Sequence, residues 1–190
     1  MEQRTSQRTG AVVTGSARGI GAAIALRLAR QGYGVCVNYL RDRDRAENVV
    51  HRIESSGGAA FAHRADIGTP DEPARLVAAT AERYGGVRVL VNNAGFSQHA
   101  SLAEMTYKEW RRMLDVHLDG AFLMVKAALP WMGREPWGRV INISSLRAMT
   151  GSMNGAHYAA AKSGLIGLTR SLALSLAPRI TANAVCPGYT

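Results

Sequence analysis

The chain has 190 residues, of which 47% are apolar and 19% charged, and its formal net charge is +9. This composition is typical of one folded domain and excludes an intrinsically disordered chain. Its two cysteines lack a CxxC spacing, which argues against a disulfide framework or a zinc site, and its apolar stretches are too short to span a bilayer.

The positive charge favours anionic partners, but the arginines are scattered from Arg4 to Arg179 and no nucleic-acid motif accompanies them. We therefore expect neither nucleic acid nor a membrane as a partner. The polar residues 1–8 lack the apolar segment of a signal peptide. They are predicted to form a flexible tail on a cytoplasmic protein, in front of a single domain over residues 9–190.

Short β-branched runs alternate with longer amphipathic segments along the chain. The expected strands are Ala11–Thr14, Val35–Tyr39, Ala59–Ala65, Val87–Val91, Arg139–Ser144 and Thr181–Cys186. The expected helices are Ile20–Gln31, Arg43–Ser55, Pro70–Tyr84, Thr106–Trp131 and Tyr158–Ala177, and the fourth of these begins with the capping-box pair Thr106 and Glu109. Repeated strand–helix–strand units without hairpin signals predict a doubly wound α/β fold, in which helices cover both faces of a parallel sheet.

The first expected strand runs into the segment Thr14–Gly21, with the sequence TGSARGIG, and then directly into a helix. Glycines there let the backbone approach a pyrophosphate, whose charge is favoured by the N–H groups at the start of the helix. A tight strand-to-helix turn would also use glycines. The position after the first strand of a βαβ unit nevertheless favours a dinucleotide site in a Rossmann-like domain.

The residues after the second strand bear on the choice of dinucleotide. An NAD site uses a carboxylate there to hold the ribose hydroxyls, but the segment Asn38–Arg41 places no acid at the strand end. Arg18 in the glycine turn and Arg41 could together bind a 2′-phosphate, so NADP is favoured over NAD. The alternative is that the charges of Arg41–Arg45 are only the solvated start of a helix.

Tyr158 and Lys162 are four residues apart and share one face of the last expected helix. A free phenol has a pKa near 10, too high for a base at neutral pH, whereas an adjacent cation favours the phenolate. Lowering that pKa by about three units would take roughly 4 kcal/mol, which is more than one exposed pair supplies. A buried setting or a bound, positively charged nicotinamide must therefore contribute. The alternative is an ordinary helix-surface pair.

Taken together, these motifs resemble the short-chain dehydrogenase/reductase family from about Arg8 to the last residue, and most closely its 3-oxoacyl-acyl-carrier-protein reductase-like subgroup. The matching segments, in chain order, are Thr14–Gly21, Asp66, Asn92–Gly95, Ile143–Ser145, Tyr158-x-x-x-Lys162 and Asn183–Gly188. The resemblance implies an NADP-dependent oxidoreductase that reversibly transfers a hydride between nicotinamide and a carbonyl or secondary alcohol. A 3-oxoacyl thioester is one candidate substrate, and no metal is implied.

The resemblance also implies residue roles. Tyr158 would donate and accept the proton, Ser145 would hold the substrate oxygen, and Lys162 would lower the tyrosine's pKa and hold the nicotinamide ribose. Asp66 would contact the adenine. The full set of expected cofactor-binding residues is Gly15, Ser16, Arg18, Gly19, Ile20, Gly21, Tyr39, Arg41, Asp66, Ile67, Asn92, Ala94, Gly95, Tyr158, Lys162, Pro187, Gly188 and Thr190.

His117 departs from the family pattern, which commonly has asparagine at this position to hold a water that links the lysine to solvent. An imidazole can also bond water, so we hypothesise that His117 keeps the proton relay as a fourth catalytic residue. The alternative is that His117 only fills a helix-packing position. Replacing it with alanine without changing turnover at any pH would refute the relay.

The end of the chain is a second departure, because family members ordinarily continue through a substrate-covering segment and a seventh strand that also joins subunits. The chain is therefore expected to be truncated, with Thr181–Cys186 as a sheet edge, reduced stability, an open substrate site and homo-oligomers only at full length. An acidic acyl carrier protein would suit the +9 charge, with Arg134 or Arg179 as contacts. The rival functions are a cofactor-binding protein without catalysis and, third, a Rossmann-like methyltransferase, which would not explain Tyr158 with Lys162.

Overall fold

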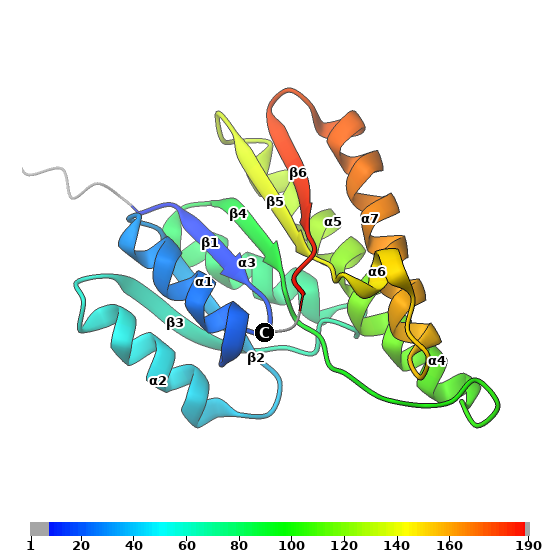
Figure 1. Ribbon diagram of the computed structural model, residues 1–190. Helices are drawn as coiled ribbons and strands as arrows, with labels where there is room; N and C mark the ends of the chain where they lie inside the picture. Colours follow the sequence, from blue (N-terminus) through cyan, green and yellow to red (C-terminus); the bar gives the residue numbers. More distant parts are fainter. Residues whose placement is uncertain (1–7, 189–190) are drawn as a thin grey trace, which may run out of the picture.

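The computed structural model describes residues 8–188 (Figure 1). The expected N-terminal tail lies outside this range apart from Arg8, and so does Thr190. The strands are β1 Gly10–Val13, β2 Gly34–Tyr39, β3 Ala59–Arg64, β4 Val87–Asn92, β5 Gly138–Ile143 and β6 Ile180–Val185. Within the described range they form one parallel sheet in the order β3-β2-β1-β4-β5-β6, which confirms the doubly wound, Rossmann-like prediction.

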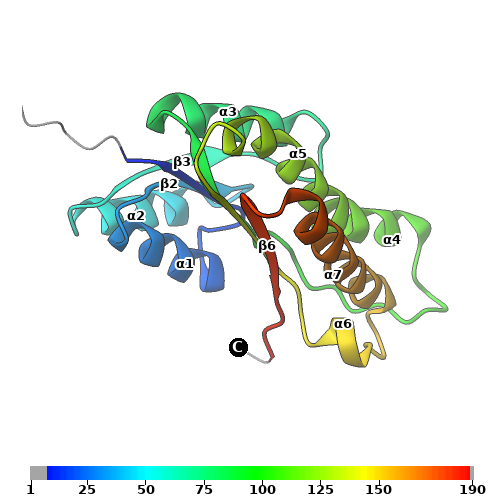
Figure 2. The ribbon, with the colours of Figure 1, turned by 90° about the horizontal axis from the view of Figure 1, so that it is seen from above.

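The helical elements are α1 Gly19–Arg30, α2 Arg43–Glu54, α3 Glu72–Tyr84, α4 Tyr107–Leu114, the π-helix η1 Asp115–Asp119, α5 Gly120–Met132, α6 Arg147–Thr150 and α7 Ala156–Leu176. Helices α1 and α2 cover one face of the sheet, and α3, α5 and α7 cover the other (Figure 2). Among the described residues, no helix is long and apolar enough to cross a membrane.

Both faces of the central strands are apolar because each face is covered. Val12 and Leu90 pack with α3 and α5, whereas their neighbours Val13 and Val91 pack with α1 and α2. The register pairs Val13 with Val37 of β2 on one side and with Val91 of β4 on the other. The carboxyl ends of β1, β2 and β4 therefore meet at one edge, where a doubly wound sheet binds its ligands.

The expected single helix Thr106–Trp131 is wrong in one respect, because it divides into α4, η1 and α5. Its start is confirmed: Thr106 and Glu109 form a capping box, with the Glu109 N–H donating to the Thr106 hydroxyl oxygen at 3.2 Å. The π-helical turn escaped the sequence analysis because a widened turn leaves no mark on a helical period. The short helix α6 was not expected either.

Candidate active site

The glycine turn between β1 and α1 is shaped by close backbone contacts. Gly15 has a φ of +60°, and a Cβ atom there would lie 2.7 Å from the Cα of Ala94. A Cβ at Gly21 would lie 2.6 Å from the Gly15 carbonyl oxygen, so only glycine fits at either position. Gly19 has a φ of +56° and open space in place of a side chain. Its exposed backbone, beside an α1 whose N-cap residue Arg18 makes no side-chain capping bond, fits a pyrophosphate.

Two polar side chains that were not among the expected site residues hold this turn in place. The Asn38 side-chain oxygen accepts from the Gly15 N–H at 2.9 Å, and its amide nitrogen donates to the Ala65 carbonyl at 3.1 Å. The Asn93 amide donates to the Thr14 and Gly15 carbonyls at 2.9 and 3.1 Å. Side chains from β2 and from the loop after β4 thus fix the turn from both sides.

Asn92, an expected cofactor residue, has its side chain turned into the sheet instead. Its amide donates to the Asn142 side-chain oxygen at 2.8 Å, and the Asn142 amide donates to the Thr169 hydroxyl at the same distance. All three residues are buried. Asn92 therefore links β4 to β5 and α7, whereas the next residues along, Ala94 and Gly95, line the cavity described below.

A cavity of about 560 Å³ lies at the carboxyl ends of β1, β2 and β3. Its lining contains eight of the 18 expected cofactor-binding residues, namely Gly15, Arg18, Tyr39, Arg41, Asp66, Ile67, Ala94 and Gly95, together with others that include Asn38, Asp42, Arg45, Phe96, Arg112 and Val116. Arg18, Arg41 and Arg45 are exposed, and Arg45 is paired with Asp42 at 3.1 Å. The wall beside the β2 end is therefore positively charged, which suits a phosphorylated nucleotide.

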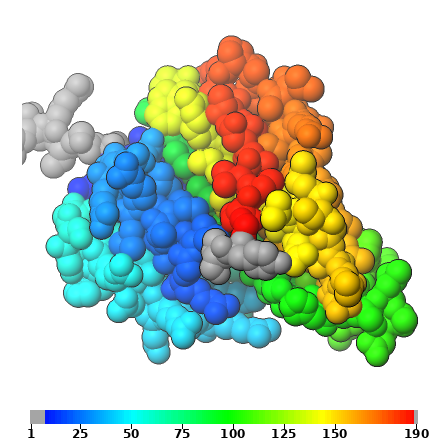
Figure 3. Space-filling model, in the orientation of Figure 1, coloured from blue at the N-terminus to red at the C-terminus, as the bar shows by residue number. Residues whose placement is uncertain are grey.

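A second cavity, of about 270 Å³, brings together the expected catalytic hydroxyls. Ser145, two residues after the end of β5, lines it together with Tyr158 of α7, Pro187 and Gly188. The Ser145 hydroxyl oxygen accepts from the Arg147 N–H at 3.1 Å, which orients the side chain. In the space-filling view the end of β6 lies between the surfaces of α1 and α6 (Figure 3).

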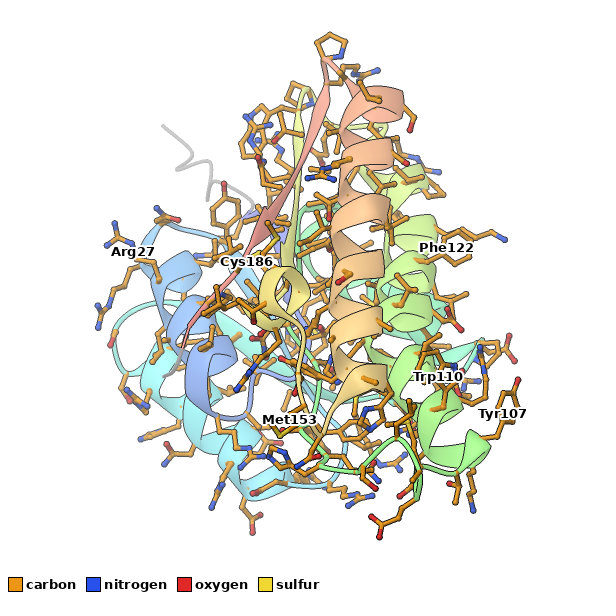
Figure 4. The ribbon with its side chains drawn as sticks, turned by 45° about the vertical axis from the view of Figure 1, so that its right-hand side comes forward. Arg27, Tyr107, Trp110, Phe122, Met153 and Cys186 are labelled. Atoms are coloured by element: carbon orange, nitrogen blue, oxygen red, sulfur yellow. The ribbon has the colours of Figure 1, made fainter. Side chains whose placement is uncertain are left out.

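Segments on both sides of this cavity can be followed in Figure 4, where Cys186 marks the end of β6 and Met153 the loop between α6 and α7. Their neighbours Pro187 and Ser152 line the cavity. Met153 is 94% exposed, so the loop presents an apolar side chain to solvent beside the cavity.

Lys162 lies one helical turn after Tyr158 and is almost completely buried, with 4% of its surface exposed. Its Nζ atom donates to the Ile143 carbonyl at 2.6 Å and lies 5.8 Å from the centroid of the Tyr158 ring. Burial lowers the pKa of Lys162 to about 8. The amine is therefore still mostly protonated at neutral pH, and it places a positive charge beside the phenol.

His117 is also buried, at 3% exposure, because the η1 turn directs it towards α7. Its ring meets the Tyr158 ring edge to face, with the centroids 5.2 Å apart. Nε2 lies 3.1 Å from the Phe96 nitrogen and 3.0 Å from the Phe96 carbonyl oxygen, whereas Nδ1 is buried without a partner among the described residues. Burial, and secondarily the Lys162 charge, lowers the pKa of His117 to about 3, so the imidazole is neutral.

The chain matches known proteins over almost its whole length. The sequence profile described as short chain dehydrogenase matches residues 9–190. A 3-oxoacyl-[acyl-carrier-protein] reductase FabG from Staphylococcus aureus is 43% identical over 94% of this chain and 73% of its own length. A 3-oxoacyl-[acyl-carrier-protein] reductase from Synechocystis is 42% identical over the same shares.

Two further similar proteins are described as dehydrogenases. A D-beta-hydroxybutyrate dehydrogenase from Rhizobium meliloti is 38% identical over 94% of this chain and 70% of its own length. The crystal structure of a dehydrogenase/reductase from Sinorhizobium meliloti superposes with a TM-score of 0.92, at 39% identity, over 96% of this chain and 72% of that one. The chain belongs to the short-chain dehydrogenase family of oxidoreductases, whose members use a nicotinamide cofactor.

Proposed function

We propose that this protein is an NADP-dependent carbonyl reductase that also catalyses the reverse oxidation of an alcohol. The observation that carries the proposal is that Ser145 and Tyr158 line one cavity, while the charged amine of Lys162 lies against the Tyr158 ring. A hydroxyl pair of this kind can hold a carbonyl oxygen on which negative charge develops.

The preference for NADP rests on the charges around the larger cavity. A 2′-phosphate beside the end of β2 would meet Arg18, Arg41 and Arg45, with Asp42 as the acid that partly offsets them. Charge-assisted hydrogen bonds contribute about 1.5–3 kcal/mol each, and less at exposed positions such as these. The open backbone at Gly19 would hold the pyrophosphate, and Asp66 would face the adenine.

The chemistry divides between the cofactor and the chain. A bound reduced nicotinamide would supply a hydride to the carbonyl carbon. Ser145 and Tyr158 would donate hydrogen bonds to the carbonyl oxygen, and Tyr158 would then give up its proton. The Lys162 ammonium would stabilise the phenolate that remains, because it is buried beside the ring, where solvent screens the attraction less.

A 3-oxoacyl thioester is the substrate class that the two carrier-protein reductases support. An acidic carrier would meet a chain of charge +9. Of the two surface arginines considered for that contact, Arg179 already donates to the Gly133 and Glu135 carbonyls, and Arg134 lies 4.8 Å from the Trp131 ring. Arg134 is therefore the better candidate for carrier contact.

A small anionic 3-oxo acid is a second candidate substrate. The observation that favours it is the smaller cavity itself, whose lining, among the residues that the structure describes, includes the basic residue Arg147 and no aspartate or glutamate. One relative is named for D-beta-hydroxybutyrate, which carries such a carboxylate. The cavity polarity would favour a carboxylate over a neutral thioester.

The test is a screen that follows NADPH oxidation with acetoacetyl thioesters and with free acetoacetate, run in parallel with NADH. Turnover that Tyr158→Phe abolishes, while NADPH affinity stays normal, would support the reductase. NADPH binding without turnover on any carbonyl compound would support instead a protein that binds the cofactor without catalysis. The ratio of thioester to free-acid turnover decides between the two substrate classes.

A further inference from the structure

An ion pair joins helix α4 to the loop after β3 at the wall of the larger cavity. The Nη2 atom of Arg112 donates to Oδ2 of Asp66 at 2.8 Å. The other carboxylate oxygen, Oδ1, accepts from the Gly68 N–H at 3.0 Å. Both oxygens of Asp66 are thus engaged, which fixes the plane of a carboxylate that lines the cavity.

The loop is shaped to admit the guanidinium. A Cβ atom at Gly68 would lie 2.9 Å from Nη1 of Arg112 and 3.2 Å from a methyl group of Val116, so the missing side chain makes room for both residues. The Asp66 N–H is itself held by the Glu72 carboxylate at the start of α3. Arg112, Val116 and the Asp66 loop therefore form one wall of the cavity.

The partial exposure of this pair argues for a role beyond stability. The side chains of Arg112 and Asp66 are 40% and 22% exposed. Partly exposed ion pairs contribute little to folding stability. The preceding residue, Arg111, pairs instead with Asp115 and Asp119 of its own helical segment and does not line the cavity.

We propose that Arg112 is a positioning residue of the nucleotide site, which holds the Asp66 carboxylate in the orientation that accepts a hydrogen bond from the amino group of an adenine ring. This inference rests on the proposed function, because it takes the larger cavity as the site of the adenosine half of the cofactor. An ionised carboxylate only accepts hydrogen bonds, so it suits a base with an exocyclic amine. The guanidinium keeps that acceptor aimed before the nucleotide arrives, which reduces the cost of ordering the site on binding.

The residue acts on one half of the cofactor only. A dinucleotide contains the adenine, whereas reduced nicotinamide mononucleotide lacks it. Loss of Arg112 should therefore weaken the dinucleotide and leave the mononucleotide unaffected. The catalytic hydroxyls line a different cavity, to which Arg112 does not contribute, so the maximal rate with saturating NADPH should stay unchanged.

The primary experiment is calorimetric titration of Arg112→Gln with NADP⁺, together with steady-state kinetics. We expect the Kd for NADP⁺ and the KM for NADPH to rise by about three- to tenfold, as for loss of one partly exposed charge-assisted contact, while kcat changes less than twofold. The value of kcat/KM for reduced nicotinamide mononucleotide should match that of the unchanged protein. Arg111→Gln, which removes the same charge one residue earlier, is the matched control and should leave both constants unchanged.

A double-mutant cycle makes the test specific to the ion pair. In an Asp66→Asn background, Arg112→Gln should cost little further affinity, because the carboxylate it positions is gone. Arg112→Lys keeps the charge and should therefore recover part of the affinity that Arg112→Gln loses. If Arg112→Gln shows no cooperative unfolding transition, the same measurements are made with Arg112→Lys in its place.

Three results would overturn the inference. They are unchanged NADP⁺ affinity in Arg112→Gln, an equal loss with and without Asp66, and a loss that also affects the mononucleotide. If the unchanged protein binds no NADP⁺ at all, the proposed function fails first, and the two failures are thus told apart.

Discussion

Gly95 lies directly against the ring of His117, so closely that a Cβ atom at residue 95 would come within 2.3 Å of the imidazole Cε1 atom. The ring cannot retreat freely, because it is packed between the aromatic rings of Phe96 and Tyr158, with centroids 5.5 and 5.2 Å away. The loop after β4 and the η1 turn are thus fitted to each other at the side of the Tyr158 ring.

We predict that Gly95→Ala destabilises the protein by about 1–3 kcal/mol, the usual cost of overpacking a filled site, and lowers kcat by displacing His117 against Tyr158. Urea unfolding and steady-state kinetics check the two effects. Gly167→Ala is the control, because a Cβ there meets nothing within 4 Å and should be neutral or slightly stabilising in a helix. A fully stable Gly95→Ala protein would contradict the fit described above.

His117 should make stability depend on pH. Its pKa is about 3 in the folded protein against the ordinary value of 6.5, so the unfolded chain binds the proton first as the pH falls. The contribution of the neutral His117 to the free energy of unfolding is therefore complete above about pH 6.5 and is lost progressively as the pH falls to about 3. Between pH 7 and pH 4.5 we expect a loss on the order of 2 kcal/mol that His117→Asn does not show.

The measurement is urea unfolding of both proteins at the two pH values, with His99→Asn as the control, because His99 is exposed. Equal pH dependence in the unchanged and His117→Asn proteins would show that the buried imidazole does not resist protonation. The proton relay is tested separately: it requires the pH profile of turnover to change in His117→Ala, whereas a packing role alone does not.

The buried charge of Lys162 should lower the stability of the protein. Burial lowers its pKa to about 8 from 10.5, so folding with a charged amine is disfavoured at neutral pH and improves as the pH rises from 8 to 10.5. Lys162→Met should be more stable by about 1 kcal/mol at pH 7, after allowing for the lost bond to the Ile143 carbonyl. Its advantage should shrink towards pH 10.5.

The same variant should lose at least about a hundredfold in turnover, because Tyr158, the general acid, loses the charge that stabilises its phenolate. Thermal or urea unfolding at pH 7 and pH 10 measures the stability difference, and NADPH oxidation measures the rate. A Lys162→Met protein that is less stable than the unchanged one at pH 7 would mean that the carbonyl bond outweighs the cost of burying the charge.

Cofactor preference should follow the charge at the end of β2. Arg41→Gln should lower the ratio of kcat/KM for NADPH to that for NADH by about tenfold, which corresponds to about 1.4 kcal/mol. Arg43→Gln is the control, since Arg43 lies close by but pairs with Glu47 at 3.5 Å and does not line the cavity. If both variants shift the ratio equally, only general surface charge is involved.

The sequence predicts the frame of the molecule well for identifiable reasons. Each strand except β3, whose sequence is AAFAHR, contains β-branched residues in a largely apolar run, and the absence of hairpin turns between the strands leaves a parallel sheet as the consistent arrangement. The Thr106–Glu109 spacing also marks a helix start without reference to the rest of the fold, as the structure confirms. These features are local, so a local pattern is sufficient to find them.

The contacts that shape the site are not local, and the sequence does not reveal them. Asn38 sits in an apolar strand, where its residue type gives no hint that it holds Gly15, 23 residues away. The Arg112–Asp66 pair spans 46 residues. The family motifs pointed to Asp66 and to the segment Asn92–Gly95 but not to their partners, and the departure at His117 marked a special position without predicting the π-helical turn.

At the carboxyl edge of the sheet, the position of Asn38 separates the residues that shape the glycine turn from those that would select the cofactor. One of the side chains that shape the glycine turn, the buried amide of Asn38, acts from inside the sheet, whereas the arginines that would bind the cofactor's phosphate lie outside it in solvent. Reprogramming this protein for another nucleotide should therefore require changes only to solvent-facing residues, and a library randomised at those positions should retain folded members at high frequency. Randomising residue 38 in the same library should deplete them.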